Sequence, residues 1–186
     1  GKGTVVDAAI VDGSAHMMTL LMALRQRGPQ NSTRGTSLLD GPHWSRSYAC
    51  ADGGFISVQC LEPKFYGIFL DLLGLGDDLD FTAQFNPETW PQATMRLIDL
   101  FASQPRDHWC ALFAGSDACA APILSPDEAL TDPLSKARGI WHGGDIPLQA
   151  APAPRFDGQA LNPAISPIRG AHTDEILAML GKTTDS

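Results

Sequence analysis

A pair of glycines between two short β-strand patterns is the feature that most restricts the fold of this 186-residue chain. The two patterns, residues 47–50 and 55–60, flank Gly53-Gly54, and glycine supplies the positive φ that a tight hairpin turn requires. Pro63 follows the second pattern, and apolar residues then recur at helical spacing up to Gly74. The sequence therefore predicts an antiparallel hairpin that leads directly into an amphipathic helix.

The rest of the chain is predicted as short elements separated by loops. Helical periodicity, capping residues and glycine or proline stops set the helix boundaries. In chain order, the predicted elements are a strand at 4–8, a helix at 10–27 stopped by Gly28, a loop at 28–42, an acidic loop at 74–86, helices at 88–103 and 105–113, an edge or irregular strand at 120–124, a helix capped by Ser125 and ending before Pro133, a Pro-rich connector at 146–167, and a capped helix that starts at Thr173 and stops before Gly181.

These elements divide the chain into four segments. Residues 1–28 hold a strand and a helix, 29–40 form a linker, 41–145 form a compact α+β unit, and 146–186 hold a Pro-rich segment and a C-terminal helix. The chain opens on Gly1 and enters a β-branched run almost at once, which favours an internal fragment over a processed or artificial terminus.

Composition and spacing argue against several classes of function. The formal net charge is −8, and an acidic surface repels phosphate backbones, so we expect no nucleic-acid partner. No apolar run approaches the ~20 residues that span a bilayer, which favours a soluble, cytoplasmic protein with no membrane partner. Four cysteines without a CxxC pair are predicted to be buried thiols in a reducing cytosol, rather than disulfide or zinc ligands. The five histidines lack metal-ligand spacing, so no metal site is expected.

Glu62 is the candidate catalytic residue. It continues the face of the alternating run that carries Ile56, Val58 and Cys60, so its carboxylate is expected to point toward a core or a cleft. Burial would raise its pKa toward the range of a general acid or base. Pro63 in the first helical position would instead make Glu62 a helix cap, which the helix dipole favours. Spacing alone favours the cap, and the sequence does not fix the pKa.

Two further residues have functional alternatives. Asp117 could be a catalytic carboxylate on a loop, but an Asp beside Gly115-Ser116 more often bonds backbone N–H groups and shapes the turn. His43 lies in a Gly/Pro loop near the hairpin and could line a cleft, although a packed or solvated side chain is favoured.

Several segments, taken in order, resemble the family III CoA-transferases and their relatives, the α-methylacyl-CoA racemases. Each segment is a weak match alone, and the ordered set covers nearly the whole chain. The segments are Gly1-Lys2-Gly3 with Val5 to Gly13, Arg34-Gly35, Leu39-Asp40-Gly41, Tyr48, Ala51-Asp52-Gly53, Leu61-Glu62-Pro63-Lys64-Phe65-Tyr66 (similar to the racemase pattern E-P-x-F-Y), Trp90-Pro91, Trp109 with Phe113, Gly115 to Cys119 with Pro122-Ile123-Leu124, and His172 to Leu177.

The resemblance implies an α/β protein with a Rossmann-like large domain and a smaller α+β domain, built as an interlocked homodimer. This chain would supply the small domain, together with the strand and helix at 1–28 and the C-terminal helix of the large domain. The implied activity is isomerisation of a 2-methylacyl-CoA thioester in fatty acid and lipid metabolism, with coenzyme A as part of the substrate and no separate cofactor. Glu62 matches the family's glutamate, and Leu61 beside it is the expected substrate-binding residue.

The opposing His and Asp of the family lie in segments before Gly1, so we expect the chain by itself to be inactive. Family III CoA transfer and a non-catalytic dimerisation or lid role remain alternatives. The sequence also departs from the family at three positions: Gln59 and Cys60 stand where a glycine is common before the glutamate, and Ala49 replaces a more usual arginine. These bulkier or uncharged residues leave the identity of the acyl group open.

Overall fold

The structure, a computed structural model, describes residues 3–28, 30–144, 146–159 and 161–182. The chain forms two compact units that divide between Ile123 and Leu124. The first unit is organised around a three-stranded antiparallel sheet in the order β1-β2-β3, and the second holds a two-stranded sheet, β4-β5. The four predicted segments, with boundaries at 28, 40 and 145, stay predictions.

The glycine-based hairpin is confirmed. Strands β1 (Ser45–Ala49) and β2 (Phe55–Gln59) pair antiparallel, with Tyr48 opposite Ile56. The Cys50 N–H donates to the Gly54 carbonyl at 2.8 Å, and Gly53 has φ +80°, which suits glycine. Strand β3 (Ala120–Ile123) pairs with the other side of β2 and is an edge strand, where the missing N–H of proline is tolerated.

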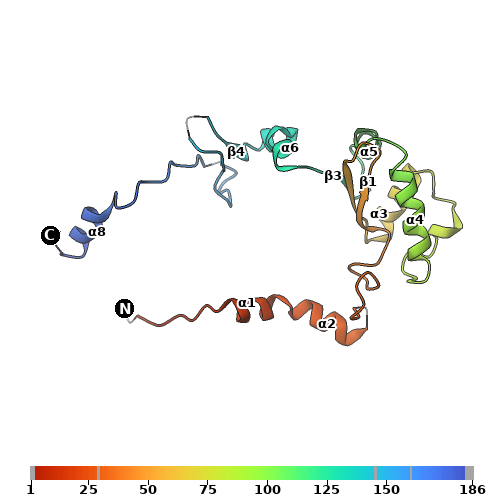
Figure 1. The fold of residues 1–186 in the computed structure, drawn as a ribbon, viewed down its shortest axis with the longest axis horizontal. Helices are drawn as coiled ribbons and strands as arrows, with labels where there is room; N and C mark the ends of the chain where they lie inside the picture. The colour runs from red at the N-terminus through yellow and green to blue at the C-terminus, as the bar shows by residue number, and fades with distance from the viewer. Residues whose placement is uncertain (1–2, 29, 145, 160, 183–186) are drawn as a thin grey trace. The chain divides into compact units, whose positions relative to one another are not determined.

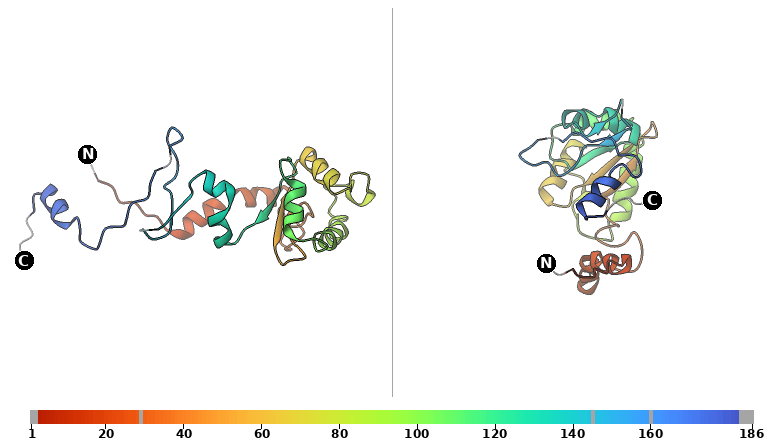
Figure 2. Two further views of the ribbon diagram at one scale, coloured as in Figure 1. Left: turned by 90° about the horizontal axis from the view of Figure 1, so that it is seen from above. Right: turned by 90° about the vertical axis from the view of Figure 1, so that its left-hand side faces the viewer.

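Three helices pack with this sheet to form the core. Helix α4 (Trp90–Phe101) packs against β1, α5 (Arg106–Phe113) against β2 and β3, and α3 (Pro63–Leu72) against α5 (Figure 1). Figure 2 shows the sheet and these helices from two further directions.

Aromatic rings fill the space between the sheet and the helices. The fully buried Phe101 ring stacks on Tyr48 with ring centroids 4.9 Å apart and meets the edge of Trp109 at 5.0 Å. Ile56, Val58 and Cys60, the predicted inward face of β2, are fully buried. Burial of this face is what determines the register of the sheet.

The N-terminal segment differs from the prediction. Residues 4–8 pair with no strand in the described part of the chain, and a β-strand exists only through such pairing. The predicted helix at 10–27 is two helices, α1 (Ile10–Met17) and α2 (Thr19–Arg27), which divide at Met18 (φ −73°, ψ −6°). Gly28 ends α2 in the left-handed conformation, as predicted. No residue of α1 or α2, both fully described, is buried.

The described residues of the second unit form three short helices and one pair of two-residue strands. Ser125 starts α6 (Pro126–Thr131) with a capping box: its hydroxyl accepts from the Glu128 N–H, and its own N–H donates to the Glu128 carboxylate. The other elements are α7 (Pro133–Ala137), β4 (Trp141–His142), β5 (Gln149–Ala150) and α8 (Thr173–Met179).

Two details of the second unit correct the prediction. His172 occupies the N-cap position of α8 and makes no capping hydrogen bond, so Thr173 is the first helical residue and not the cap. The start of the Pro-rich connector forms β5, which pairs with β4. Within the described residues, no helix has the length and apolar character needed to cross a membrane.

Candidate functional site

Glu62 lies at the junction between β2 and α3. Strand β2 ends at Gln59 and α3 begins at Pro63. Glu62 occupies the N-cap position with extended backbone angles (φ −75°, ψ 136°), and its carbonyl accepts the first helical hydrogen bond from the Tyr66 N–H at 3.0 Å. The predicted strand-to-helix junction with proline in the first turn is confirmed.

The Glu62 side chain has neither of the two orientations that the sequence suggested. It is exposed, and it makes no capping hydrogen bond to the first turn of α3. The inward face ends at Cys60 because Gln59, opposite Ser45, is the last residue of β2 in the ladder, so period-two alternation no longer applies at position 62. The carboxylate is therefore presented to the surroundings at the positive end of a ten-residue helix. Leu61, the predicted substrate-binding residue, is 41% exposed beside it.

Gln84 holds the chain directly before Glu62. Its buried side-chain amide donates to the carbonyls of Cys60 at 3.1 Å and Leu61 at 2.9 Å. Sequence patterns do not single out this residue, because a glutamine in an irregular loop carries no periodicity or motif. The only sequence hint is its place between two aromatic residues, Phe81 and Phe85, in an otherwise acidic loop.

Cys119 is a potentially reactive group close enough to Glu62 for the two to interact electrostatically. The Gln59 N–H donates to the Cys119 carbonyl at 3.0 Å, which places residue 119 next to the end of β2. Loss of hydration, and then the Glu62 and Asp117 carboxylates, raise the pKa of the Cys119 thiol, so it is not an activated nucleophile.

The cysteine prediction holds only in part. All four cysteines are free; Cys50 and Cys60 are buried, Cys110 is half-buried, and Cys119 is exposed. Burial raises the pKa of the Cys60 thiol to about 12, so this residue packs as a small apolar group.

The turn at residues 115–118 is stabilised by Ser116 rather than by Asp117. The Ser116 hydroxyl donates to the Phe113 carbonyl at 2.7 Å and accepts from the Ala118 N–H at 3.4 Å. Among the described residues the exposed Asp117 carboxylate accepts no hydrogen bond, so the prediction that it shapes the turn is not supported. A hydroxyl suits this position because it donates and accepts at the same time.

His43 is a core residue, as the favoured interpretation predicted. It is fully buried, and its Nε2 lies 2.7 Å from the Tyr66 hydroxyl. That hydroxyl donates to the Phe81 carbonyl at 2.9 Å, which leaves its oxygen to accept from the His43 Nε2–H. Burial, and then the charge of Arg46, lower the pKa of His43 to about 4. A neutral, enclosed imidazole cannot serve as the partner of the exposed Glu62.

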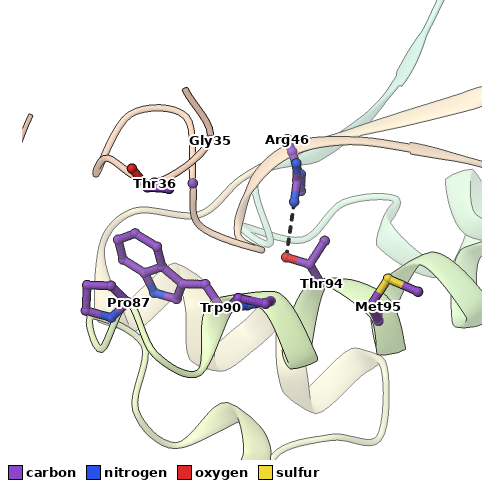
Figure 3. A pocket seen from close by; sticks show the side chains of 9 residues that line it. Gly35, Thr36, Arg46, Pro87, Trp90, Thr94 and Met95 are labelled. Atoms are coloured by element: carbon purple, nitrogen blue, oxygen red, sulfur yellow. Dashed lines mark hydrogen bonds between the residues drawn. The ribbon is translucent and has the colours of Figure 1, made fainter. Parts of the chain in front are cut away.

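A separate open hollow of about 330 Å³ lies between the loop before β1 and the start of α4. Trp90 and Met95 are among the residues that line it, and Arg46 donates to the Thr94 hydroxyl at 3.1 Å across it (Figure 3). Its lining includes neither Glu62 nor Leu61. No group of three or more His, Cys, Asp or Glu side chains is placed to hold a metal ion within the described residues.

Comparison with known proteins identifies the family of the chain. CoA-transferase family III matches the sequence over residues 1–173. The chain belongs to this family. It is 33% identical to the alpha-methylacyl-CoA racemases of Homo sapiens and Mus musculus over 97% of its length, and it spans 48% of the length of each. A CaiB/baiF CoA-transferase family protein of Caenorhabditis elegans is 30% identical over 69% of this chain and 36% of that protein.

Solved structures show the same mixed α/β fold. A CAIB/BAIF family protein from Brucella suis has a TM-score of 0.61 at 22% identity, covering 96% of this chain and 48% of that one. A variant of the Mycobacterium tuberculosis protein Rv3272 has a TM-score of 0.63 at 17% identity, covering 91% and 46%. The chain therefore has the small-sheet α/β fold of these family proteins and corresponds to about half of their length. The Rossmann-like large domain stays a prediction.

Proposed function

We propose that this chain contributes one acid/base group, Glu62, to an isomerase that racemises 2-methylacyl-CoA thioesters. The observation that carries the proposal is the exposed Glu62 carboxylate, which makes no capping bond to α3, in a chain 33% identical to two alpha-methylacyl-CoA racemases over 97% of its length. A carboxylate used as a structural cap would be bound to backbone N–H groups, whereas this one is available to a ligand.

The proposed reaction is inversion at the carbon beside the thioester carbonyl. One group removes the α-proton, the thioester stabilises the enolate that forms, and a second group returns a proton to the opposite face. In this proposal Glu62 serves one face and Leu61 contacts the acyl chain. The opposing His and Asp come from a part of the protein outside this chain. A cytoplasmic homodimer acting in lipid metabolism belongs to the same proposal.

The test of this proposal is incorporation of deuterium from heavy water. The full-length protein, incubated with one stereoisomer of a 2-methylacyl-CoA, is expected to give both stereoisomers with deuterium at the α-carbon. Chiral chromatography coupled to mass spectrometry measures both changes in one sample. Retention of the α-hydrogen and of the starting configuration over many hours would contradict the proposal.

CoA transfer is the second candidate, because the similar Caenorhabditis elegans protein is named a CoA-transferase family protein. In that reaction a carboxylate nucleophile forms acyl and CoA intermediates, and CoA moves to a second carboxylate. Adding a free carboxylate to the same incubation distinguishes the two reactions. Transfer yields a new acyl-CoA and a free 2-methyl acid without α-deuterium, whereas racemisation yields deuterium without a new thioester.

The chain by itself is expected to be inactive in this assay. One carboxylate cannot both remove a proton from one face of a carbon and deliver a proton to the other face. Purified residues 1–186 should therefore show no inversion above a buffer blank at substrate and protein concentrations where the full-length protein reaches equilibrium. Inversion by the chain alone would show that it contains both groups.

A further inference from the structure

We infer that Gln84 is a positioning residue for Glu62, an inference that rests on the acid/base role proposed above. Gln84 does not face a substrate: it is 7% exposed and lies beneath the strand-to-helix junction. Its role would be to fix the direction from which the exposed Glu62 carboxylate approaches the α-carbon.

The Gln84 side chain holds two consecutive peptide groups. Its amide nitrogen carries two hydrogens, and they are directed to the carbonyls of Cys60 at 3.1 Å and Leu61 at 2.9 Å. The Leu61 carbonyl and the Glu62 nitrogen belong to one planar peptide unit. Fixing that carbonyl therefore fixes the plane to which the Glu62 Cα is attached.

The loop that carries Gln84 is itself anchored. The Gln84 carbonyl accepts from the indole N–H of Trp44 at 3.0 Å and of Trp90 at 2.8 Å. The Trp44 carbonyl in turn accepts from the Cys60 N–H at 3.1 Å. Cys60, Trp44 and Gln84 thus form a closed ring of hydrogen bonds, and all three residues are buried. Buried, fully connected networks of this kind hold one geometry.

This anchor makes a selective test practicable. Both indole bonds go to the main-chain carbonyl of Gln84, so a change of its side chain leaves them in place. Gln84→Met keeps the length and approximate volume of the side chain and removes both amide donors. Gln84→Asn keeps the amide but is one methylene too short to reach both carbonyls, and it serves as a second variant if the methionine variant does not fold.

Each variant is expected to lower kcat for inversion on the order of 10- to 100-fold with little change in KM, because the catalytic group is displaced while substrate contacts remain. Gln92→Met is the matched control, since the exposed Gln92 amide donates to the Asp80 carboxylate at 3.1 Å and does not contact the junction. The control should retain the wild-type kcat. Thermal unfolding of each variant shows that the protein compared is folded.

A double-mutant cycle separates positioning from general damage. If Gln84 acts through Glu62, Gln84→Met should cause no further loss in a protein that already carries Glu62→Gln. Losses that multiply would overturn the positioning role, as would a folded Gln84→Met variant with wild-type kcat beside a slow Glu62→Gln. A Glu62→Gln variant that inverts at the wild-type rate would instead overturn the proposed function itself, and the positioning role with it.

Discussion

Replacing Glu62 by glutamine in the full-length protein should slow inversion of a 2-methylacyl-CoA by about 10²- to 10⁴-fold, the usual contribution of a positioned acid/base. The amide has nearly the same shape as the carboxylate but cannot take the α-proton or return it. Glu62 is exposed and makes no capping hydrogen bond, so this change should leave the thermal stability nearly unchanged. The measurement is the rate of loss of optical purity under saturating substrate.

The same variant should separate proton exchange from inversion. With Glu62 disabled, the group on the opposite face can still remove and return a proton on its own side. One stereoisomer should therefore exchange its α-hydrogen for deuterium with retention of configuration, and the other should be inert. Glu88→Gln is the matched control, an exposed glutamate in the loop before α4 whose N–H donates to the Asn86 side chain. Full-speed inversion by Glu62→Gln would eliminate its acid/base role.

The features predicted correctly from the sequence are those set by local backbone chemistry. The hairpin turn at Gly53, the Pro63 helix start and the Ser125 capping box each depend on residues within about four positions of one another. The buried face of β2 was also predictable, because period-two alternation follows directly from strand geometry. These features located the junction at Glu62.

The features that the sequence did not predict depend on distant partners. The Glu62 side chain turns outward because Gln59 is the last paired residue of β2, and the length of a strand is set by its neighbours. Gln84 bonds to Leu61 and Cys60, which lie 23 and 24 positions before it in the sequence, and no local sequence pattern predicts such a contact. The exposed Cys119 likewise follows from where β3 pairs with β2. A candidate residue could be named from sequence, whereas its orientation and support could not.

The protein should lose stability on mild acidification because of His43. Burial lowers the pKa of this imidazole to about 4, from 6.5 in an unfolded chain. Between these values the unfolded state binds a proton that the folded state excludes, so the free energy of unfolding falls as the pH falls below 6.5. From pH 7 to pH 5 the expected loss is about 2 kcal/mol. Well above pH 6.5 the imidazole is neutral in both the folded and the unfolded state, so its titration costs no stability there.

The structural reason is that the second N–H of a protonated His43 would have no hydrogen-bond acceptor among the described residues. Nε2 donates to Tyr66, and the buried Nδ1 has no hydrogen-bond partner among the described residues. Protonation of Nδ1 would place an unpaired charge in the core, against the first turn of α3 that begins beside Glu62. Acidification should therefore weaken the His43–Tyr66 contact, and with it the junction. This weakening should occur at a higher pH than unfolding of the sheet.

Urea denaturation at pH 7, 6 and 5 measures this effect. His43→Gln keeps a donor toward Tyr66 but does not titrate, so its stability should be lower at pH 7 and much less dependent on pH over this range. His108→Gln, which changes an exposed histidine in α5, should retain the pH dependence of the parent protein. Because the surface carboxylates are the same in all three proteins, the difference in slope isolates His43. Equal slopes in the parent and His43→Gln would show that the imidazole is hydrated and titrates freely, contrary to the buried contact with Tyr66.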